Sequence, residues 1–219
     1  MEHQFLIVVI NGPPYSGKDT IISKLMQATT PYCMLNHRHI QGWHEKMVMP
    51  LRDALCSMFN IGGFTYETCK DDPILPNAVT PRQAIMALDV EWARPLFGED
   101  FLGNLLVKEL ERNRRQKGGR FEFDDQVNIH FVDAGVEPEF QALKSAYGDR
   151  VKVIRVNRTD LQFDGTRTWL SQCDAVVHNH EGQVDEAVNQ ILLHINRWLE
   201  KLDDKVDAGV TAGVLAEGS

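Results

Sequence analysis

The chain has 219 residues and a formal net charge of −8, with 43% hydrophobic and 25% charged residues. These proportions are typical of a globular protein, and the acidic balance argues against non-specific binding to a nucleic-acid backbone. No apolar run approaches the roughly eighteen residues that a membrane span needs, and the early run Phe5 to Ile10 is too short for the core of a signal peptide. We therefore expect a cytoplasmic protein with neither nucleic acid nor a membrane as a partner.

Strands alternate with helices along the sequence. In chain order, hydrophobic periodicity predicts strand 5–10, helix 19–28, strand 32–35, helix 45–59, helix 80–94, helix 101–116, strand 127–132, helix 140–147, strand 151–156, strand 175–177 and helix 184–202. Pro50 is expected to interrupt its helix, and Pro95 to end the helix before it. Residues 60–77, which are rich in glycine and proline, predict a long irregular loop of the kind that is often functional.

This alternation predicts an α/β fold with a mostly parallel sheet and helices on both faces. There is no internal repeat and no linker that would separate two domains, so residues 1–202 are expected to form a single domain. The small, polar and aperiodic residues 203–219 predict a flexible tail.

The most informative motif is Gly12-Pro13-Pro14-Tyr15-Ser16-Gly17-Lys18, which fits the phosphate-binding pattern G-x-x-x-x-G-K. It follows a buried strand and begins a helix, so backbone N–H groups would face an anion while Lys18 reaches the outer phosphates of a nucleotide. The next residue is Asp19 rather than the usual serine or threonine. Asp19 either approaches Mg²⁺ or acts as a favourable anion in the first helical turn. The motif predicts a P-loop NTPase fold that binds ATP through Gly12, Tyr15, Ser16, Gly17, Lys18, Asp19 and Thr20.

From this motif onward the chain resembles the deoxynucleoside monophosphate kinases of bacteriophages. The matching segments, in order, are the phosphate loop, Met49-Pro50-Leu51-Arg52-Asp53-Ala54-Leu55, Thr80-Pro81-Arg82-Gln83 continuing to Glu91-Trp92-Ala93-Arg94, Asp133 after a strand, and Asp174 to Asn179. They span nearly the whole chain up to about Ile195. The block from Thr80 to Arg94 is the most specific of them, because many families share the phosphate loop.

The resemblance implies a nucleoside monophosphate kinase core with a helical acceptor-binding insertion over about residues 37–126 and a short lid over about residues 157–172. It also implies that Arg82 and Arg94 hold the acceptor phosphate, where a guanidinium fork fits better than an ammonium group. Arg158 and Arg167 would belong to the lid that closes over the phosphates and excludes water.

Two further positions follow from the resemblance. Asn179 would contact ATP, and Asp133, at the end of a strand, would bind Mg²⁺ or position water. The family usually has an arginine soon after this aspartate, whereas Asp133 is followed here by Ala134, Gly135, Val136 and Glu137.

Other residue groups have weaker functional interpretations. His37, His39 and His44 fit no ordinary zinc spacing and are expected in a polar loop. Trp43 is a candidate for stacking on the acceptor base.

The expected reaction is ATP-dependent conversion of a (deoxy)nucleoside monophosphate to the diphosphate, with Mg²⁺ as cofactor. A monophosphate is already a competent nucleophile, so catalysis needs positioning and charge neutralisation rather than a strong general base. Two alternatives remain open: a small-metabolite kinase on the same core, similar to phosphomevalonate kinase, and a regulatory protein that binds a nucleotide without transferring phosphate. A homodimer also remains open.

Overall fold

The computed structural model describes residues 5–29, 34–35, 38–116, 127–158, 161 and 168–216, with side chains except at 34, 35, 38, 114–116 and 203–216. The chain divides into two compact units. The first comprises Met1–His44, Glu122–Phe131 and Lys152–Ser219, and the second comprises Glu45–Phe121 and Val132–Val151. The second unit thus begins later than the insertion expected over 37–126, and it also includes a segment after that insertion.

The first unit is built on a sheet with strand order β2-β3-β4-β1-β5-β6. The strands are β1 (Phe5–Asn11), β2 (Met34–Leu35), β3 (Arg38–Lys46), β4 (Val127–Asp133), β5 (Val151–Asn157) and β6 (Ala175–His178). Five of them form an all-parallel sheet, and the short β2 pairs antiparallel with β3 at one edge. Helices flank this sheet, so the expected α/β class with a parallel sheet is confirmed. Rossmann-like and P-loop folds share this architecture.

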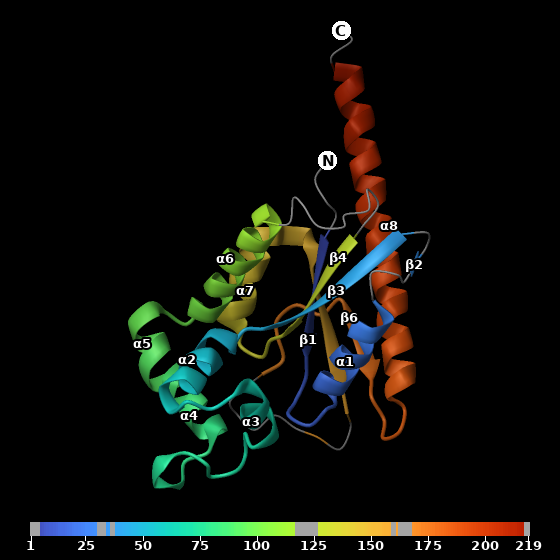
Figure 1. Ribbon diagram of the computed structural model, residues 1–219. Coiled ribbons are helices and arrows are strands. Elements are labelled where there is room, and N and C mark those ends of the chain that lie inside the picture. Colours follow the sequence, from blue (N-terminus) through green and yellow to red (C-terminus); the bar gives the residue numbers. More distant parts are fainter. Residues whose placement is uncertain are drawn as a thin grey trace. The chain divides into compact units, whose positions relative to one another are not determined.

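Hydrophobic burial explains the centre of the first unit. Every residue of β1 is buried, because this strand lies between β4 and β5. Helix α1 (Lys18–Ala28) buries Ile21, Ile22 and Leu25, a spacing that places them on one side of the helix. Helix α8 (Val184–Ala216) contacts α1, and both contribute to the main core (Figure 1). Together they fix the start of α1, where the glycine-rich loop ends.

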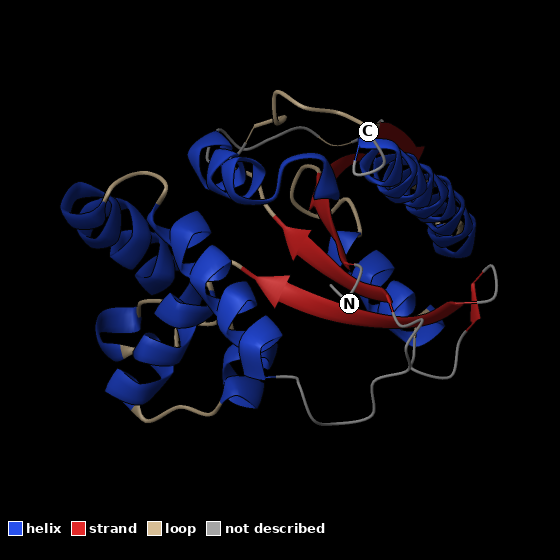
Figure 2. Ribbon diagram, turned by 90° about the horizontal axis from the view of Figure 1, so that it is seen from above, coloured by secondary structure: helices blue, strands red, loops and turns tan. Residues whose placement is uncertain are grey.

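The second unit is helical apart from short strand ends, as the blue ribbons in Figure 2 show. Its helices are α2 (Met49–Phe59), α3 (Gly63–Thr68), α4 (Pro81–Ala87), α5 (Arg94–Phe97), α6 (Phe101–Gln116) and α7 (Glu137–Tyr147). A π-helical segment, Leu88–Ala93, joins α4 to α5, and short 3₁₀ turns cover Pro76–Ala78 and Gly148–Arg150. Leu55, Tyr66, Leu75 and Ile85 form a small core between α2, α3 and α4.

Two local features position these helices. Thr80 and Gln83 form a reciprocal capping box at the start of α4, which satisfies two backbone N–H groups. Helices α6 and α7 pack closely, because a Cβ added at Gly103 would lie 2.4 Å from the backbone oxygen of Glu139. Glycine is therefore required at this helix contact.

Several expected elements differ in the structure. The second parallel strand is β3, so the described histidines, His39 and His44, lie in a strand rather than in a polar loop. Helix α2 begins at Met49, and Pro50 lies in its first turn, where its missing N–H is harmless, instead of interrupting a helix.

Further along the chain, three more expectations are wrong. The loop expected over 60–77 contains α3. Pro95 lies in the first turn of α5 rather than after the end of a helix. Helix α8 continues to Ala216, past the end expected at residue 202. None of the helices in the described part of the chain is long and apolar enough to cross a membrane.

Candidate functional site

The glycine-rich loop, residues 12–17, joins the buried β1 to the start of α1. It closes as a turn through a hydrogen bond from Ser16 N to Pro13 O of 3.3 Å. Tyr15 has φ 63° and Gly17 has φ 88°, so two residues close together are left-handed. A left-handed backbone is unfavourable for a tyrosine, and strained residues of this kind cluster at ligand-binding and active sites. Tyr15 is also 79% exposed.

The two glycines of the motif are held against neighbouring elements. A Cβ at Gly12 would lie 2.7 Å from the oxygen of Val156 on β5, and one at Gly17 would lie 2.3 Å from Nδ2 of Asn179. At Gly12 the loop therefore approaches the backbone of β5 more closely than a larger residue would permit, whereas at Gly17 the close neighbour is the end of a side chain and the positive φ adds to the preference for glycine. This matches the reason that phosphate-binding loops carry glycine.

Lys18 turns back over the loop that precedes it. Its side chain is buried, with the residue only 7% exposed, and Nζ donates to the carbonyls of Gly12 at 2.9 Å and Pro13 at 2.8 Å. A buried ammonium group needs such acceptors, because an uncompensated charge away from water is unfavourable. The consequence is a full positive charge fixed at the mouth of a loop whose neighbouring N–H groups also attract anions.

Asn179 and Ser16 complete the described part of this site. Asn179 follows β6, is 4% exposed, and donates from Nδ2 to the carbonyl of Ser16 at 2.7 Å. Within the described residues, the buried hydroxyl of Ser16 and the buried Oδ1 of Asn179 have no hydrogen-bond partner. Buried polar atoms are rarely left so, and a bound ligand is one ordinary explanation. Asn179, which the sequence predicted to contact ATP, thus contacts the glycine-rich loop directly.

Asn11, the last residue of β1, links the loop to residues 168–170, and the sequence analysis gave it no role. Its Nδ2 donates to Thr168 O at 3.1 Å, and its Oδ1 accepts from Leu170 N at 3.2 Å. Arg155 on β5 supports the same segment by donating to Leu170 O at 2.6 Å and lying 5.5 Å from the ring centroid of Trp169. A polar residue that ends a wholly buried strand is the signal that could have found Asn11.

Only part of the expected lid is described. Arg158, just after β5, reaches the carbonyl of Tyr15 with Nη1 at 3.5 Å, so it lies beside the glycine-rich loop. Arg167 lies outside the described residues, as does half of the expected lid.

The candidate magnesium residues have different surroundings. Asp19 is exposed in the first turn of α1, beside the exposed Thr20 that was expected to contact ATP, and Asp133 is half-buried at the end of β4. Among the described residues no group of three or more His, Cys, Asp or Glu side chains could hold a metal ion. Mg²⁺ usually binds one or two carboxylates together with substrate phosphates and water, and single carboxylates at these positions fit that mode.

The two arginines expected at the acceptor site have different partners in the second unit. Arg82 on α4 pairs with Asp71, its Nη2 lying 3.0 Å from Oδ2, and its side chain is 48% exposed. Arg94 is 17% exposed and contacts three carboxylates, those of Asp89, Glu99 and Glu139. Its hydrogen bond to Asp89 is the main cause that raises the pKa of Arg94.

Trp43, the candidate for base stacking, lies on β3 in the first unit. Its indole Nε1 donates to Oδ1 of Asn128 on the neighbouring β4 at 3.2 Å. The ring is therefore tied to the sheet, and its contact with a base stays a prediction.

A comparison with protein-family models finds no match to this chain, and a search of curated proteins finds no significant match.

Proposed function

We propose that this chain is a P-loop phosphotransferase that moves the γ-phosphoryl group of ATP to a (deoxy)nucleoside monophosphate. The observation that carries the proposal is the glycine-rich loop between β1 and α1. It combines a buried lysine, left-handed backbone at Tyr15 and Gly17, and a buried Ser16 hydroxyl without a partner among the described residues. This combination suits the phosphates of a nucleotide, because charge, N–H donors and close backbone approach occur together.

In the proposed reaction, a phosphate oxygen of the acceptor attacks the γ-phosphorus of ATP. The new P–O bond forms as the bond between the γ-phosphorus and the bridging oxygen breaks, and ADP leaves with that electron pair. Lys18 and Arg158 would neutralise the charge on the transferred group. Mg²⁺, held by the nucleotide phosphates with Asp19 or Asp133, would supply further charge neutralisation.

The acceptor half of the proposal rests on the resemblance of residues 80–94 and on a cationic side chain there. Arg82 is exposed and its partner, Asp71, is exposed as well, so an anionic ligand could replace this ion pair at little cost. The regulatory alternative needs no such acceptor site.

The test is a coupled assay of ADP release with ATP, Mg²⁺ and each of the nucleoside and deoxynucleoside monophosphates. ADP should form rapidly only when an acceptor is present. An equal rate without an acceptor would show an ATPase, and activity with phosphorylated metabolites alone would favour the small-metabolite kinase.

A matched pair of variants locates the donor site. Lys18→Met should reduce turnover by more than about tenfold, because it removes the positive charge that would neutralise the negative charge developing in the transition state. Lys24→Met, on the same helix and paired with Asp185 at the surface, should leave turnover unchanged. Circular dichroism and thermal melting would confirm that both variants are folded.

A further inference from the structure

Four cationic side chains gather within residues 46–82 of the second unit, although the whole chain carries a net charge of −8. They are Lys46 at the end of β3, Arg52 on α2, Lys70 after α3 and Arg82 on α4. The same stretch holds four carboxylates, those of Asp53, Glu67, Asp71 and Asp72, so an anion can bind these cations only in exchange for a carboxylate. We call these four residues the basic cluster.

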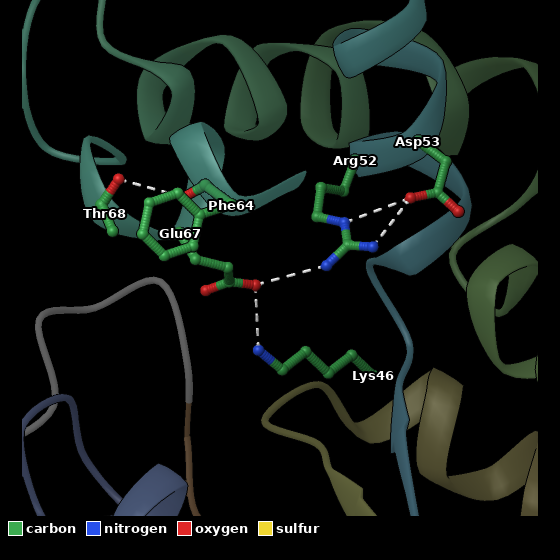
Figure 3. A network of polar contacts seen from close by, with 6 residues as sticks. All are labelled: Lys46, Arg52, Asp53, Phe64, Glu67 and Thr68. Atoms are coloured by element: carbon green, nitrogen blue, oxygen red, sulfur yellow. Dashed lines mark hydrogen bonds and ion pairs between the residues drawn. The ribbon is translucent and has the colours of Figure 1, made fainter. Parts of the chain in front are cut away.

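At the centre of the basic cluster, one carboxylate oxygen joins two of the cations. Oε1 of Glu67 lies 3.1 Å from Nζ of Lys46 and 3.3 Å from Nη1 of Arg52 (Figure 3). Asp53 takes the other side of the guanidinium, 2.9 Å from Nη2. The ammonium and guanidinium groups thus converge on a single anionic oxygen, which is the arrangement that a phosphate oxygen requires.

Tyr66 connects this centre to Arg82. The tyrosine is buried in the small core of the second unit, and its hydroxyl interacts electrostatically with both Arg52 and Arg82. Lys70 interacts in the same way with Glu67 and with Asp71, the partner of Arg82. The backbone N–H of Arg82 also donates to the carbonyl of Lys70 at 3.0 Å, so the start of α4 lies against the segment 67–71, whose carboxylates pair with both halves of the cluster.

The covering carboxylates are easy to replace, in contrast to those around Arg94. The Glu67 side chain is 36% exposed, so water can solvate it once it leaves Arg52. The carboxylate of Glu139 beside Arg94 is only 7% exposed, so water would solvate it poorly if it lost Arg94. The Arg52 side chain is only 16% exposed, so water reaches it less than it reaches the carboxylate of Glu67. These differences favour Arg52 over Arg94 as a partner of Arg82.

We propose that Lys46, Arg52 and Arg82 bind the phosphate group of the acceptor, and that Glu67 is an internal anion which this phosphate displaces. The inference rests on the proposed function for the identity of the acceptor. Replacement of a carboxylate by a phosphate dianion adds a negative charge among the cations, whereas a monoanion adds none. Glu67 therefore makes the site selective for dianionic phosphate groups.

The test measures binding of inorganic phosphate by calorimetry at neutral pH, with chloride replacing phosphate as the control titration. Arg52→Met should weaken binding about tenfold to a hundredfold, the usual effect of losing one charge-assisted hydrogen bond. Arg52→Lys should recover part of the loss, because it keeps the charge without the fork. Glu67→Gln should strengthen binding about twofold to tenfold, because it removes the competing anion.

The opposite signs of these two effects identify the site. Phosphate bound at the glycine-rich loop would be insensitive to both substitutions. Arg112→Met removes a surface arginine paired with Glu109 and should leave phosphate binding unchanged. Melting temperatures of all variants, measured in parallel, separate lost binding from lost folding.

Two outcomes would overturn the inference: phosphate binding that is unchanged in folded Arg52→Met and Arg52→Lys, or binding that is unchanged or weaker in folded Glu67→Gln. The acceptor KM distinguishes this failure from failure of the proposed function. If ADP release still requires a monophosphate but the KM of that acceptor is the same in the Arg52 variants as in wild type, the phosphotransferase proposal stands and the role of Arg52 falls. If no acceptor supports ADP release, the phosphotransferase proposal falls, and calorimetry still decides whether the cluster binds phosphate.

Discussion

Replacement of Gly17 by alanine tests the geometry of the glycine-rich loop without any assumption about the reaction. Gly17 has φ 88°, and an alanine held in the left-handed region loses about 1–2 kcal/mol. Its Cβ would also lie 2.3 Å from Nδ2 of Asn179, which must move and give up its 2.7 Å bond to the carbonyl of Ser16. Loss of this donor leaves the buried carbonyl of Ser16 without its hydrogen bond, which lowers the free energy of unfolding by about 1–3 kcal/mol.

The two effects together predict that Gly17→Ala lowers the free energy of unfolding by about 3 kcal/mol. For a chain of this size that corresponds to a fall of roughly 6–12 °C in the melting temperature. Urea unfolding followed by circular dichroism measures the first quantity, and calorimetry measures the second. Gly63→Ala is the matched control, because a Cβ there meets nothing within 4 Å and φ is not positive, so its stability should be unchanged or slightly higher.

A double-mutant cycle separates the two causes. In the Asn179→Ala background the clash is gone, so Gly17→Ala should cost only the backbone share of about 1–2 kcal/mol. A loss below about 1 kcal/mol in the wild-type background, or a loss equal to that of Gly63→Ala, would refute the described loop geometry.

Two further predictions concern ion pairs of the second unit. Arg94→Met should lower the free energy of unfolding by roughly 3 kcal/mol, because it removes the cation that lies among the carboxylates of Asp89, Glu99 and Glu139, the last only 7% exposed. Arg82→Met, at an exposed pair, should change it little, and equal losses in urea unfolding would contradict this reasoning. Burial alone would raise the pKa of Glu67, but its contacts with Lys46 and Arg52 and the charge of Lys70 outweigh burial and hold the pKa below its usual value of 4.5. The stabilisation from Glu67 is therefore present above pH 4.5 and is lost as the pH falls through the lower folded-state pKa. The difference in the free energy of unfolding between wild type and Glu67→Gln should shrink on acidification. A difference that stays constant over the whole acidic range in which both proteins remain folded would contradict this lowered pKa.

The elements with strong periodicity could be predicted from the sequence. Helix α6 was expected over 101–116 and spans Phe101–Gln116, and β4 and β5 lie where apolar strands were expected. β3 was missed because it is a polar strand. Of its residues with described side chains, only Ile40 and Gly42 are buried, so no alternation of apolar and polar residues marks it.

The residues of the loop site were predictable in outline, whereas the long-range hydrogen bonds that support the loop were not. The motif indicated Lys18 and the glycines, since local chain geometry determines what they do. The bond from Asn179 to Ser16 joins residues 163 positions apart, and that from Asn11 to Leu170 joins residues 159 apart. Contacts of this range depend on the order of strands in the sheet, which a motif does not contain.

Arg94 shows why the ion-pair partners of a helical residue can be missed in the sequence. Side chains of an α-helix meet at spacings of three and four, so Asp89 and Arg94, five apart, would not be paired from the sequence. Between them the helix is π-helical over Leu88–Ala93, and its i→i+5 winding brings residues five apart together. Nε of Arg94 consequently lies 3.0 Å from Oδ1 of Asp89, and the same guanidinium reaches Glu139 on α7. The π-helical segment thus places Arg94 among carboxylates of the second unit, whereas the pair of Arg82 with Asp71 is exposed, which is why we propose Arg82 for the acceptor phosphate.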